Sequence, residues 1–489
     1  MRVFITGGTG FVGRAVALRL LREGHTVSIW TRRPDEAPAI VGGDVRIADA
    51  RSGSEGMLTE LEAADAVINL AGETIVSRWN ARRKEKLRSS RVELTRSLVD
   101  TMGRCEKPPR VFLSASAIGY YGNTLEGRFD ESSDPATDFL AQLCVDWEKE
   151  ALVAREHGAR VALYRIGIVL GDGGGALGQM LPVFRLGAGG RLGSGRQWMS
   201  WIHLDDLVEM LVAGVSDSSF EGPINAVSPT PVSNKEFTAE LGRAVNRPAL
   251  LPVPGFALRL IFGEGAKALL ASQHVTPRKL KSLGFEFQHP TLAAALSAST
   301  HSDPSVTITR AESPPTHPYL AKRGARYVLT QKTVIHAPLE EVFPFFSEAV
   351  NLGALTPPEM EFRILTPSPI DMFTGTEIDY RISLGPAPMR WRTVIEAWEP
   401  ASTAGETARF VDAQHRGPYR SWFHEHDFVA DGDRTLMTDR VWYSPPFGFL
   451  GRITHALFIR SMLRGIFEYR ATRIRLRFGA QEERRGLAA

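Results

Sequence analysis

A glycine-rich segment near the start of the chain constrains the fold more than any other feature. A short apolar run, Val3 to Thr6, is followed by Gly7, Gly10 and Gly13, and a helical pattern begins at Val12. Gly7 allows a tight turn, Gly10 lets backbone approach a ligand, and Gly13 lets the helix pack closely on the strand. The amides that open such a helix favour an anion. The order strand, glycine turn and helix therefore predicts the first unit of a parallel sheet.

The rest of the first half of the chain extends this pattern. Short β-branched runs alternate with longer helical patterns, which predicts an α/β fold with a parallel sheet wrapped by helices. The predicted strands are Val3–Thr6, Thr26–Thr31, Val45–Ile47, Ala66–Leu70, Arg110–Ser114 and Arg160–Arg165, and the predicted helices include Val12–Glu23 and Ala81–Met102. Residues 170–300 are less regular and rich in glycine, as substrate loops often are. We expect a small substrate lobe there.

The end of the second predicted strand distinguishes between two dinucleotide cofactors. It reads Trp30-Thr31-Arg32-Arg33, where an NAD-binding site usually carries an acid that holds the ribose hydroxyls. A guanidinium suits a 2′-phosphate instead, so the pattern favours NADP(H). Two solvated arginines at a strand end are the alternative. The predicted cofactor contacts in these two segments are Gly7, Gly10, Phe11, Val12, Gly13, Thr31, Arg32 and Arg33.

Length and composition set further limits. A chain of 489 residues exceeds what one hydrophobic core usually organises, so two or three domains are expected. The net charge of +3 does not indicate a nucleic-acid partner, and no apolar stretch is long enough to suggest membrane insertion. Cys105 and Cys144 are the only cysteines, too few for a disulfide framework. With no signal segment before the first strand, we expect a cytoplasmic protein.

A change of composition near residue 300 indicates a domain boundary. Residues 301–319 are rich in Ser, Thr, His and Pro, and we predict that they form a linker unable to bury a core. This gives a first domain over 1–300, with its C-terminal lobe at about 250–298, and a second domain over 320–480. The second combines alternating strand patterns with a long final helix from about Leu450 to Phe478, whose arginines we interpret as a basic solvated face.

Several motifs of the first domain resemble one protein family. Asn69-Leu70-Ala71-Gly72, Ser114-Ala115-Ser116, the run from Arg165 to Gly171 and the run from Trp201 to Asp206 resemble extended short-chain dehydrogenases and nucleoside-diphosphate-sugar epimerases. More narrowly, the runs Ser116–Gly122 and Cys144–Glu148 resemble an atypical subgroup that ends in a segment of unknown function. The resemblance covers residues 1–298 and implies a Rossmann-type doubly wound parallel sheet that binds NADP(H).

The same resemblance assigns further cofactor contacts. It implies that Leu70, Ala71, Gly72 and Glu73 border the cofactor at the carboxyl edge of the sheet. Residues Arg91–Thr95 occupy the place of an Asn-x-x-x-Thr motif beside the nicotinamide, with Arg91 where the motif has Asn. An arginine there contacts either a phosphate or an anionic substrate, and a surface salt bridge is the alternative reading.

The catalytic pair typical of the family is absent. Ordinary members use Tyr-x-x-x-Lys, whereas this chain carries Leu140 and Cys144 at those places, which cannot relay a proton in the same way. Ser116 occupies the position of the serine that holds the substrate oxygen, and Tyr120 and Tyr121 are the nearest other proton donors. We predict Ser116 and Tyr120 as catalytic residues. A structural serine and aromatic packing are the alternatives.

The second domain resembles the polyketide cyclase/dehydrase and START-like superfamily. The similar segments include Ile335–Phe343, Gly417-Pro418-Tyr419, Trp422–Phe428 and Tyr443–Gly448. The resemblance implies an α+β helix-grip domain around an apolar cavity, and therefore a hydrophobic ligand. Strand alternation places Trp422, His424 and His426 on one face, and we predict that they contact this ligand. Two histidines at this spacing are also a possible start of a metal site, but with no third ligand evident we predict no metal.

Together these features predict an NADP(H)-dependent oxidoreductase or epimerase-like enzyme acting on a small molecule that bears a hydroxyl or carbonyl group. The loss of the Tyr and Lys pair supports an alternative, a non-catalytic protein that binds or senses NADPH. Neither the substrate nor the oligomeric state follows from the sequence.

Overall fold

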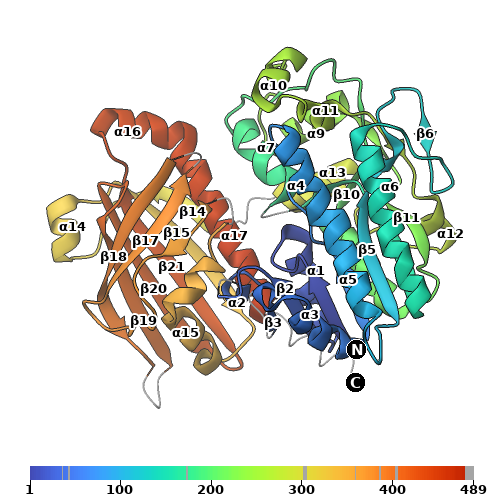
Figure 1. The fold of residues 1–489 in the computed structure, drawn as a ribbon. Helices are drawn as coiled ribbons and strands as arrows, with labels where there is room; N and C mark the ends of the chain where they lie inside the picture. Colours follow the sequence, from blue (N-terminus) through green and yellow to red (C-terminus); the bar gives the residue numbers. More distant parts are fainter. Residues whose placement is uncertain are drawn as a thin grey trace. The chain divides into compact units, whose positions relative to one another are not determined.

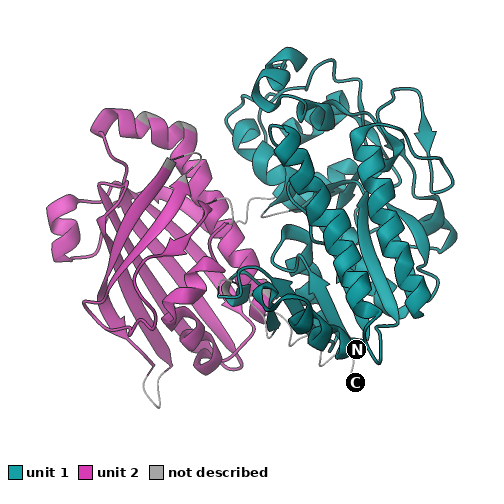
Figure 2. Ribbon diagram, viewed as in Figure 1, with its two compact units in different colours: residues 1–301 teal, residues 302–489 magenta. Residues whose placement is uncertain are grey.

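A computed structural model describes residues 1–35, 37–41, 45–171, 174–300, 305–357, 360–384, 387–401 and 406–478. The chain divides into two compact units, residues 1–301 and residues 302–489 (Figure 2). The division lies where the sequence predicts the linker to begin.

Unit 1 is built on a parallel sheet of seven strands in the order β11-β7-β5-β4-β1-β2-β3. The strands are β1 (Arg2–Thr6), β2 (Thr26–Thr31), β3 (Arg46–Asp49), β4 (Ala66–Asn69), β5 (Val111–Ala117), β7 (Arg160–Ile166) and β11 (Gly222–Ala226). The strand order reverses direction at β1, which pairs with β2 on one side and β4 on the other. In such a sheet a crevice lies beyond the carboxyl ends of the strands at this point. The predicted parallel α/β sheet is confirmed.

Helices cover both faces of this sheet (Figure 1). Val3 and Ile5 of β1 point to one face, where they share a core with α1 (Phe11–Arg22) and α8 (Leu204–Ser216). Phe4 points to the other face. The helices that pack there include α3 (Gly53–Glu62), α5 (Leu94–Met102) and α6 (Phe139–Leu152). Since every strand of the centre is buried on both sides, the sheet is doubly wound, as expected.

One predicted helix contains an irregular turn. The expected helix Ala81–Met102 is present as α4 (Ala81–Arg88), a π-helical turn η2 (Ser89–Glu93) and α5. A π-helical turn inside an α-helix is rare and frequently marks a functional site. Arg91 lies in this turn.

Much of the remainder of unit 1, within residues 170–300, forms an irregular lobe. Its core gathers buried side chains such as Trp201, Phe237 and Leu296. The short strands and 3₁₀ turns of unit 1 are β6 (Arg128–Phe129), β8 (Ile168–Leu170), β9 (Trp198–Met199), β10 (Trp201–His203), β12 (Val232–Ser233), β13 (His274–Val275), η1 (Ala50–Ser52), η3 (Ile118–Tyr121) and η4 (Val153–His157). Its remaining helices are α2 (Ala37–Val41), α7 (Gly175–Arg185), α9 (Asn234–Ala244), α10 (Gly255–Phe262), α11 (Ala266–Leu270), α12 (Arg278–Ser282) and α13 (Leu292–Thr300).

Unit 2 contains an antiparallel sheet of eight strands in the order β14-β15-β21-β20-β19-β18-β17-β16. The strands are β14 (Val306–Arg310), β15 (Tyr327–Ile335), β16 (Arg363–Ile364), β17 (Glu377–Leu384), β18 (Ala387–Glu399), β19 (Thr407–Arg416), β20 (Ser421–Asp431) and β21 (Arg434–Ser444). α14 (Pro318–Arg323), α15 (Leu339–Ser347) and the 3₁₀ turn η5 (Ala349–Gly353) complete its first part.

The predicted linker is wrong in part. Residues 306–310 form β14, an edge strand that pairs antiparallel with β15 and buries Val306 and Ile308. The alternation Val306-Thr307-Ile308-Thr309 is typical of a strand with one buried face. Ser, Thr and Pro residues dominate the composition of residues 301–319, so the composition alone does not reveal this strand. Residues 301–304 lie outside the described residues.

The long final helix is confirmed as α16 (Gly448–Thr454), a π-helical turn η7 (His455–Ile459) and α17 (Arg460–Phe478). Leu463, Phe467 and Ile474 of α17 pack into the cores formed with the sheet. The interpretation of its arginines as a solvated face is wrong for Arg470 and Arg473, whose side chains are buried. Among the described residues, no helix combines the length and apolar character needed to cross a membrane.

Candidate functional site

The glycine turn of unit 1 has the close packing that its sequence predicts. Gly7 adopts a positive φ of 71°, and a Cβ added there would lie 2.7 Å from the carbonyl carbon of Leu70. A Cβ on Gly13 would lie 2.3 Å from the carbonyl oxygen of Gly7. Gly10 is the N-cap of α1 and has no side chain to cover the first amides of Phe11 and Val12. The helix therefore opens with amides directed at the crevice and a backbone that an anion can approach.

The segment after β4 lies against this turn. The backbone amide of Leu70 donates to the carbonyl oxygen of Thr6 at 3.1 Å, and a Cβ on Gly7 would lie 2.8 Å from the amide nitrogen of Ala71. Leu70 and Ala71 thus lie against the glycine turn, and Gly72 and Glu73 follow them in the chain.

Arg32 lies at the carboxyl end of β2 with its guanidinium in solvent. Its side chain is 83% exposed, and its Nη2 atom lies 3.6 Å from Oε1 of Glu73. The Thr31 hydroxyl accepts a hydrogen bond from the Arg33 amide at 3.1 Å. Glu73 also pairs with Nη1 of Arg83 at 3.1 Å. Burial raises the pKa of Glu73, but the hydrogen bond from Arg83 and the charges of Lys86, Arg83 and Arg32 outweigh this effect and lower the pKa below its usual value.

Arg91 is not a surface salt bridge. Its Nη2 atom donates to the carbonyl oxygen of Glu73 at 2.9 Å, and a Cβ on Gly72 would lie 2.9 Å from the Arg91 guanidinium carbon. The guanidinium also lies 5.4 Å from the centre of the Trp147 ring. Burial lowers the pKa of Arg91. The π-helical turn therefore holds a half-buried cation against the loop that follows β4.

Ser116 belongs to a buried polar network. Its hydroxyl donates to Oε1 of Glu148 at 2.6 Å, and Glu148 accepts two further hydrogen bonds from Arg165 at 2.9 Å each. Arg165 also donates to the Tyr121 hydroxyl at 2.9 Å, which donates to Asn225 at 2.7 Å. The sequence reasoning did not identify the pairing of Glu148 with Arg165. Arg165, a charged residue that follows the apolar run Val161–Tyr164 in a strand, was the available signal.

Tyr120 stacks on the same network. The Arg165 guanidinium carbon lies 3.4 Å from the centre of its ring. Burial raises the pKa of Tyr120, and the charge of Arg165 opposes this rise. Burial raises the pKa of Tyr121 to about 12. Both phenols therefore remain protonated at neutral pH and are able to donate a proton.

The two residues that replace the usual Tyr and Lys face the end of β5. A Cβ on Gly119 would lie 3.5 Å from the Leu140 Cβ and 3.9 Å from the Cys144 sulfur. Burial raises the pKa of the Cys144 thiol to about 12, which makes it a poor nucleophile.

Beyond η3, a cavity of about 570 Å³ opens in the lobe. Its lining includes Asn123, Gln197, Arg259 and Ser272.

Unit 2 encloses a second cavity, of about 190 Å³. Its lining is mostly apolar and aromatic, and includes Tyr380, Trp391, Phe410, Tyr419, Met462 and Phe467. Trp422, His424 and His426 of β20 line it as well, so the three predicted ligand contacts share one cavity. Asp412 of β19 and Arg470 of α17 are the charged residues beside these histidines in the lining. The structure thus adds a third metal-ligating side chain, Asp412, that the sequence analysis did not find.

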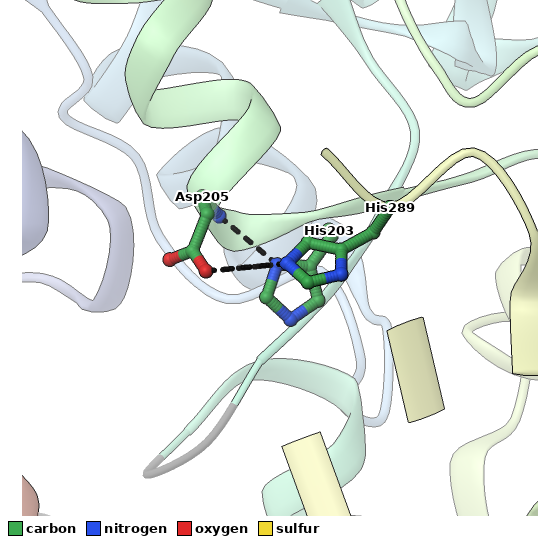
Figure 3. A group of neighbouring side chains, drawn as sticks. All are labelled: His203, Asp205 and His289. Carbon is green, nitrogen blue, oxygen red and sulfur yellow. Dashed lines mark hydrogen bonds and ion pairs between the residues drawn. The ribbon is translucent and has the colours of Figure 1, made fainter. Parts of the chain in front are cut away.

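Another His and Asp group lies at the start of α8 (Figure 3). Nδ1 of His203 accepts a hydrogen bond from the Asp205 backbone amide at 3.2 Å, and Nε2 lies 3.1 Å from the Ser299 hydroxyl oxygen. His289 approaches the Asp205 carboxylate at 3.4 Å. Because both ring nitrogens of His203 have protein partners, this group caps a helix.

Comparison with known proteins identifies the first unit. The NAD dependent epimerase/dehydratase family matches residues 3–224, and a domain of unknown function (DUF1731) matches residues 253–299. An Arabidopsis thaliana protein, "Epimerase family protein SDR39U1 homolog, chloroplastic", is 42% identical over 300 residues, which cover 61% of this chain and 86% of that protein. The Mycobacterium bovis "Epimerase family protein Mb2239" is 43% identical, with 61% and 97% covered.

A solved structure gives the same result. The crystal structure of human epimerase family protein SDR39U1 (isoform 2) with NADPH has a TM-score of 0.55 and 35% sequence identity. The similarity covers 61% of this chain and 99% of the human one. Together with the sequence relatives, this match shows that the chain belongs to the NAD-dependent epimerase/dehydratase family.

Proposed function

We propose that unit 1 binds NADP(H) in the crevice between β1, β2 and β4 and acts as an oxidoreductase or epimerase-like enzyme on a small molecule with a hydroxyl or carbonyl group. The observation that carries this proposal is the glycine turn beside an exposed Arg32. The turn offers amides to a diphosphate, and Arg32 offers a guanidinium to a 2′-phosphate. The human relative that was crystallised with NADPH supports the same choice of cofactor.

The cofactor preference gives the first prediction. Arg32→Asp is expected to weaken NADPH binding by about tenfold to a hundredfold, because a charge-assisted hydrogen bond contributes about 1.5–3 kcal/mol. NADH lacks the 2′-phosphate, so its affinity is expected to change little. Titrations followed by nicotinamide fluorescence measure both dissociation constants. Arg46→Asp is a matched control, because Arg46 is an exposed arginine on the neighbouring strand β3. Equal losses for the two cofactors would refute the assignment to NADP(H).

The proton chemistry is assigned to the network at the end of β5. When bound, the cofactor supplies or accepts a hydride. In this proposal Ser116 orients the substrate oxygen, and Tyr120 donates the proton that a reduced carbonyl oxygen needs. Glu148 and Arg165 hold both residues in position.

Turnover tests this assignment. NADPH oxidation is followed across a panel of aldehydes and ketones, and Ser116→Ala is expected to lower kcat/KM by about a hundredfold while the dissociation constant for NADPH stays unchanged. Ser114→Ala removes another buried hydroxyl from the same strand and is expected to retain activity. A Ser116→Ala protein that turns over like the Ser114→Ala control would exclude the proposed role.

A specific observation favours a second candidate function, a protein that binds NADPH without turning it over. Leu140 and Cys144 face the end of β5 where other family members place a proton relay. Tight NADPH binding without hydride transfer on the whole panel would identify the protein as a sensor or carrier of the cofactor.

For unit 2 we propose a START-like helix-grip domain that binds a hydrophobic ligand. An antiparallel sheet with a long final helix packed on it supports the fold, and an apolar cavity lined by Trp422, His424 and His426 supports the ligand. Cavities of this kind, with few polar groups, are typical of small-molecule sites.

A further inference from the structure

The mostly apolar wall of the cavity of unit 2 contains a cluster of buried polar side chains. Asp412 is the cross-strand neighbour of His424, and Asp439 is the cross-strand neighbour of His426. Both imidazoles are buried, and their rings lie 3.8 Å apart between the two carboxylates. Phe410 stacks on His426 at 4.0 Å and fixes its ring. Three cross-paired strands thus preorganise these four side chains without any contribution from a loop.

Each histidine presents one nitrogen to each carboxylate. Oδ1 of Asp439 lies 3.1 Å from Nε2 of His424 and 2.7 Å from Nδ1 of His426. Oδ1 of Asp412 lies 3.7 Å from Nδ1 of His424 and 3.1 Å from Nε2 of His426. A neutral imidazole carries a single N–H, so one side receives the protons and the other receives lone pairs.

The protons belong on the side of Asp439. This carboxylate is 1% exposed and also pairs with Arg470 at 3.5 Å. The carboxylate can only accept, so its 2.7 Å contact favours a proton on His426 Nδ1. Nη2 of Arg470 can only donate, and its longer 3.3 Å contact with the same nitrogen is then not a hydrogen bond. A buried carboxylate that accepts N–H bonds from metal-ligating histidines is the usual outer partner of a metal site.

Three lone-pair atoms then converge on the side of Asp412: its own oxygen, His424 Nδ1 and His426 Nε2. One ligand atom from each of these residues lies within 4.8 Å of the other two. The separations of 3.1 and 3.7 Å lie on either side of the value of about 3.3 Å between two ligands that each bind a tetrahedral ion at about 2.0–2.1 Å. Acceptors that face one another require either a proton, as in the 3.1 Å contact of His426 Nε2 with Asp412, or a metal cation between them.

We propose that Asp412, His424 and His426 bind a divalent first-row transition-metal ion, with Asp439 as the outer carboxylate that orients both histidines. Two imidazoles and one carboxylate suit ions such as Zn²⁺ or Fe²⁺, whereas Ca²⁺ and Mg²⁺ prefer oxygen ligands. Three protein ligands leave a coordination position open, and because all three side chains line the cavity, that position faces it. This proposal does not depend on cofactor binding by unit 1.

The group in Figure 3 provides a comparison within the same chain. His203 and His289 also lie beside an aspartate, but the ring nitrogens of His203 are engaged by the Asp205 amide and the Ser299 hydroxyl. The Asp205 side chain is 57% exposed. This group therefore lacks converging lone pairs, and its histidines are suitable for control substitutions.

Cobalt titration of the full-length protein, after removal of metals with a chelator, tests the proposal. Co²⁺ is expected to bind with one equivalent per chain and to produce visible ligand-field bands, which Zn²⁺ abolishes by displacement. His424→Gln, His426→Gln and Asp412→Asn are each expected to abolish these bands, and His289→Gln is expected to retain them. Asp439→Asn is expected to weaken binding by about tenfold to a hundredfold, because it removes only the outer partner.

Folding of each variant is checked by circular dichroism and by the thermal transition of the metal-free protein. A variant at Asp412, His424 or His426 can fail to fold. In that case the electron paramagnetic resonance spectrum of the wild-type protein with Cu²⁺ is used, because its nitrogen couplings show whether two imidazoles or fewer bind the ion. Absence of stoichiometric Co²⁺ binding in the wild type would overturn the proposal. Bands that persist in folded His424→Gln and His426→Gln, or that disappear in His289→Gln, would overturn it as well.

Discussion

Replacing Gly13 by valine is expected to lower the affinity of the protein for NADPH at least about a hundredfold, which corresponds to about 3 kcal/mol. Even the first carbon of the new side chain would lie 2.3 Å from the carbonyl oxygen of Gly7 and 2.8 Å from the Cα atom of Gly8. The glycine turn and the first turn of α1 must therefore separate. The amides proposed to hold the diphosphate then lose their common direction.

The same substitution strains the fold, so its effect on binding needs a matched control. Gly24 lies just beyond the other end of α1, has a φ of 80°, and offers open space to an added Cβ. Gly24→Ala is expected to cost about 1–2 kcal/mol of stability through backbone strain alone and to leave the NADPH dissociation constant unchanged. Isothermal titration calorimetry of both proteins, at a temperature where both are folded, separates the two effects. Comparable NADPH affinities in both variants would contradict the assigned role of the glycine turn.

Glu148→Ala is expected to destabilise unit 1 by about 3–5 kcal/mol, because it leaves the Arg165 guanidinium buried without its carboxylate. The side chains of Glu148 and Arg165 are 8% and 5% exposed, and two hydrogen bonds join them. Burial by itself would lower the pKa of Arg165, yet its hydrogen bonds with Glu148 raise the pKa above its ordinary value. The substitution removes this effect of Glu148, but an arginine side chain keeps its charge in proteins, so the charge must be solvated by local opening.

Glu150 provides the control from the same helix. It pairs with Arg96 at 2.7 Å, but the Arg96 side chain is 53% exposed. Glu150→Ala is therefore expected to cost at most about 1 kcal/mol. Hydrogen exchange of peptides from β5 and β7 reports the opening free energy of the region that contains Arg165. Equal opening free energies in the two variants would show that Glu148 and Arg165 do not form a buried ion pair.

Local sequence patterns were sufficient to predict the parallel sheet of unit 1. The alternation of Val3, Phe4 and Ile5, together with the glycines that follow, specifies a buried central strand and the turn after it. Strand β14 was missed for a physical reason as well. An edge strand buries only one face, so Val306 and Ile308 had too few apolar neighbours in sequence to stand out from a polar segment.

The candidate sites depend on pairings that no local pattern contains. The contact between Ser116 and Glu148 spans a strand and a helix that are distant in sequence, and Arg165 comes from a further strand. In unit 2, Asp412 and Asp439 occupy inward positions of their strands, but only the register of β19, β20 and β21 brings them to the two histidines. A single sequence does not define that register. For the same reason Arg470, read as a solvated residue, proved to be buried beside Asp439.

A crystal structure of the protein with NADPH tests whether unit 1 binds this cofactor as proposed. The diphosphate is expected against the amides of Phe11 and Val12, the 2′-phosphate within hydrogen-bond distance of Arg32, and the nicotinamide directed toward Ser116. A structure in which the crevice between β1, β2 and β4 stays empty at saturating NADPH, or in which the 2′-phosphate points away from Arg32, would contradict this proposal.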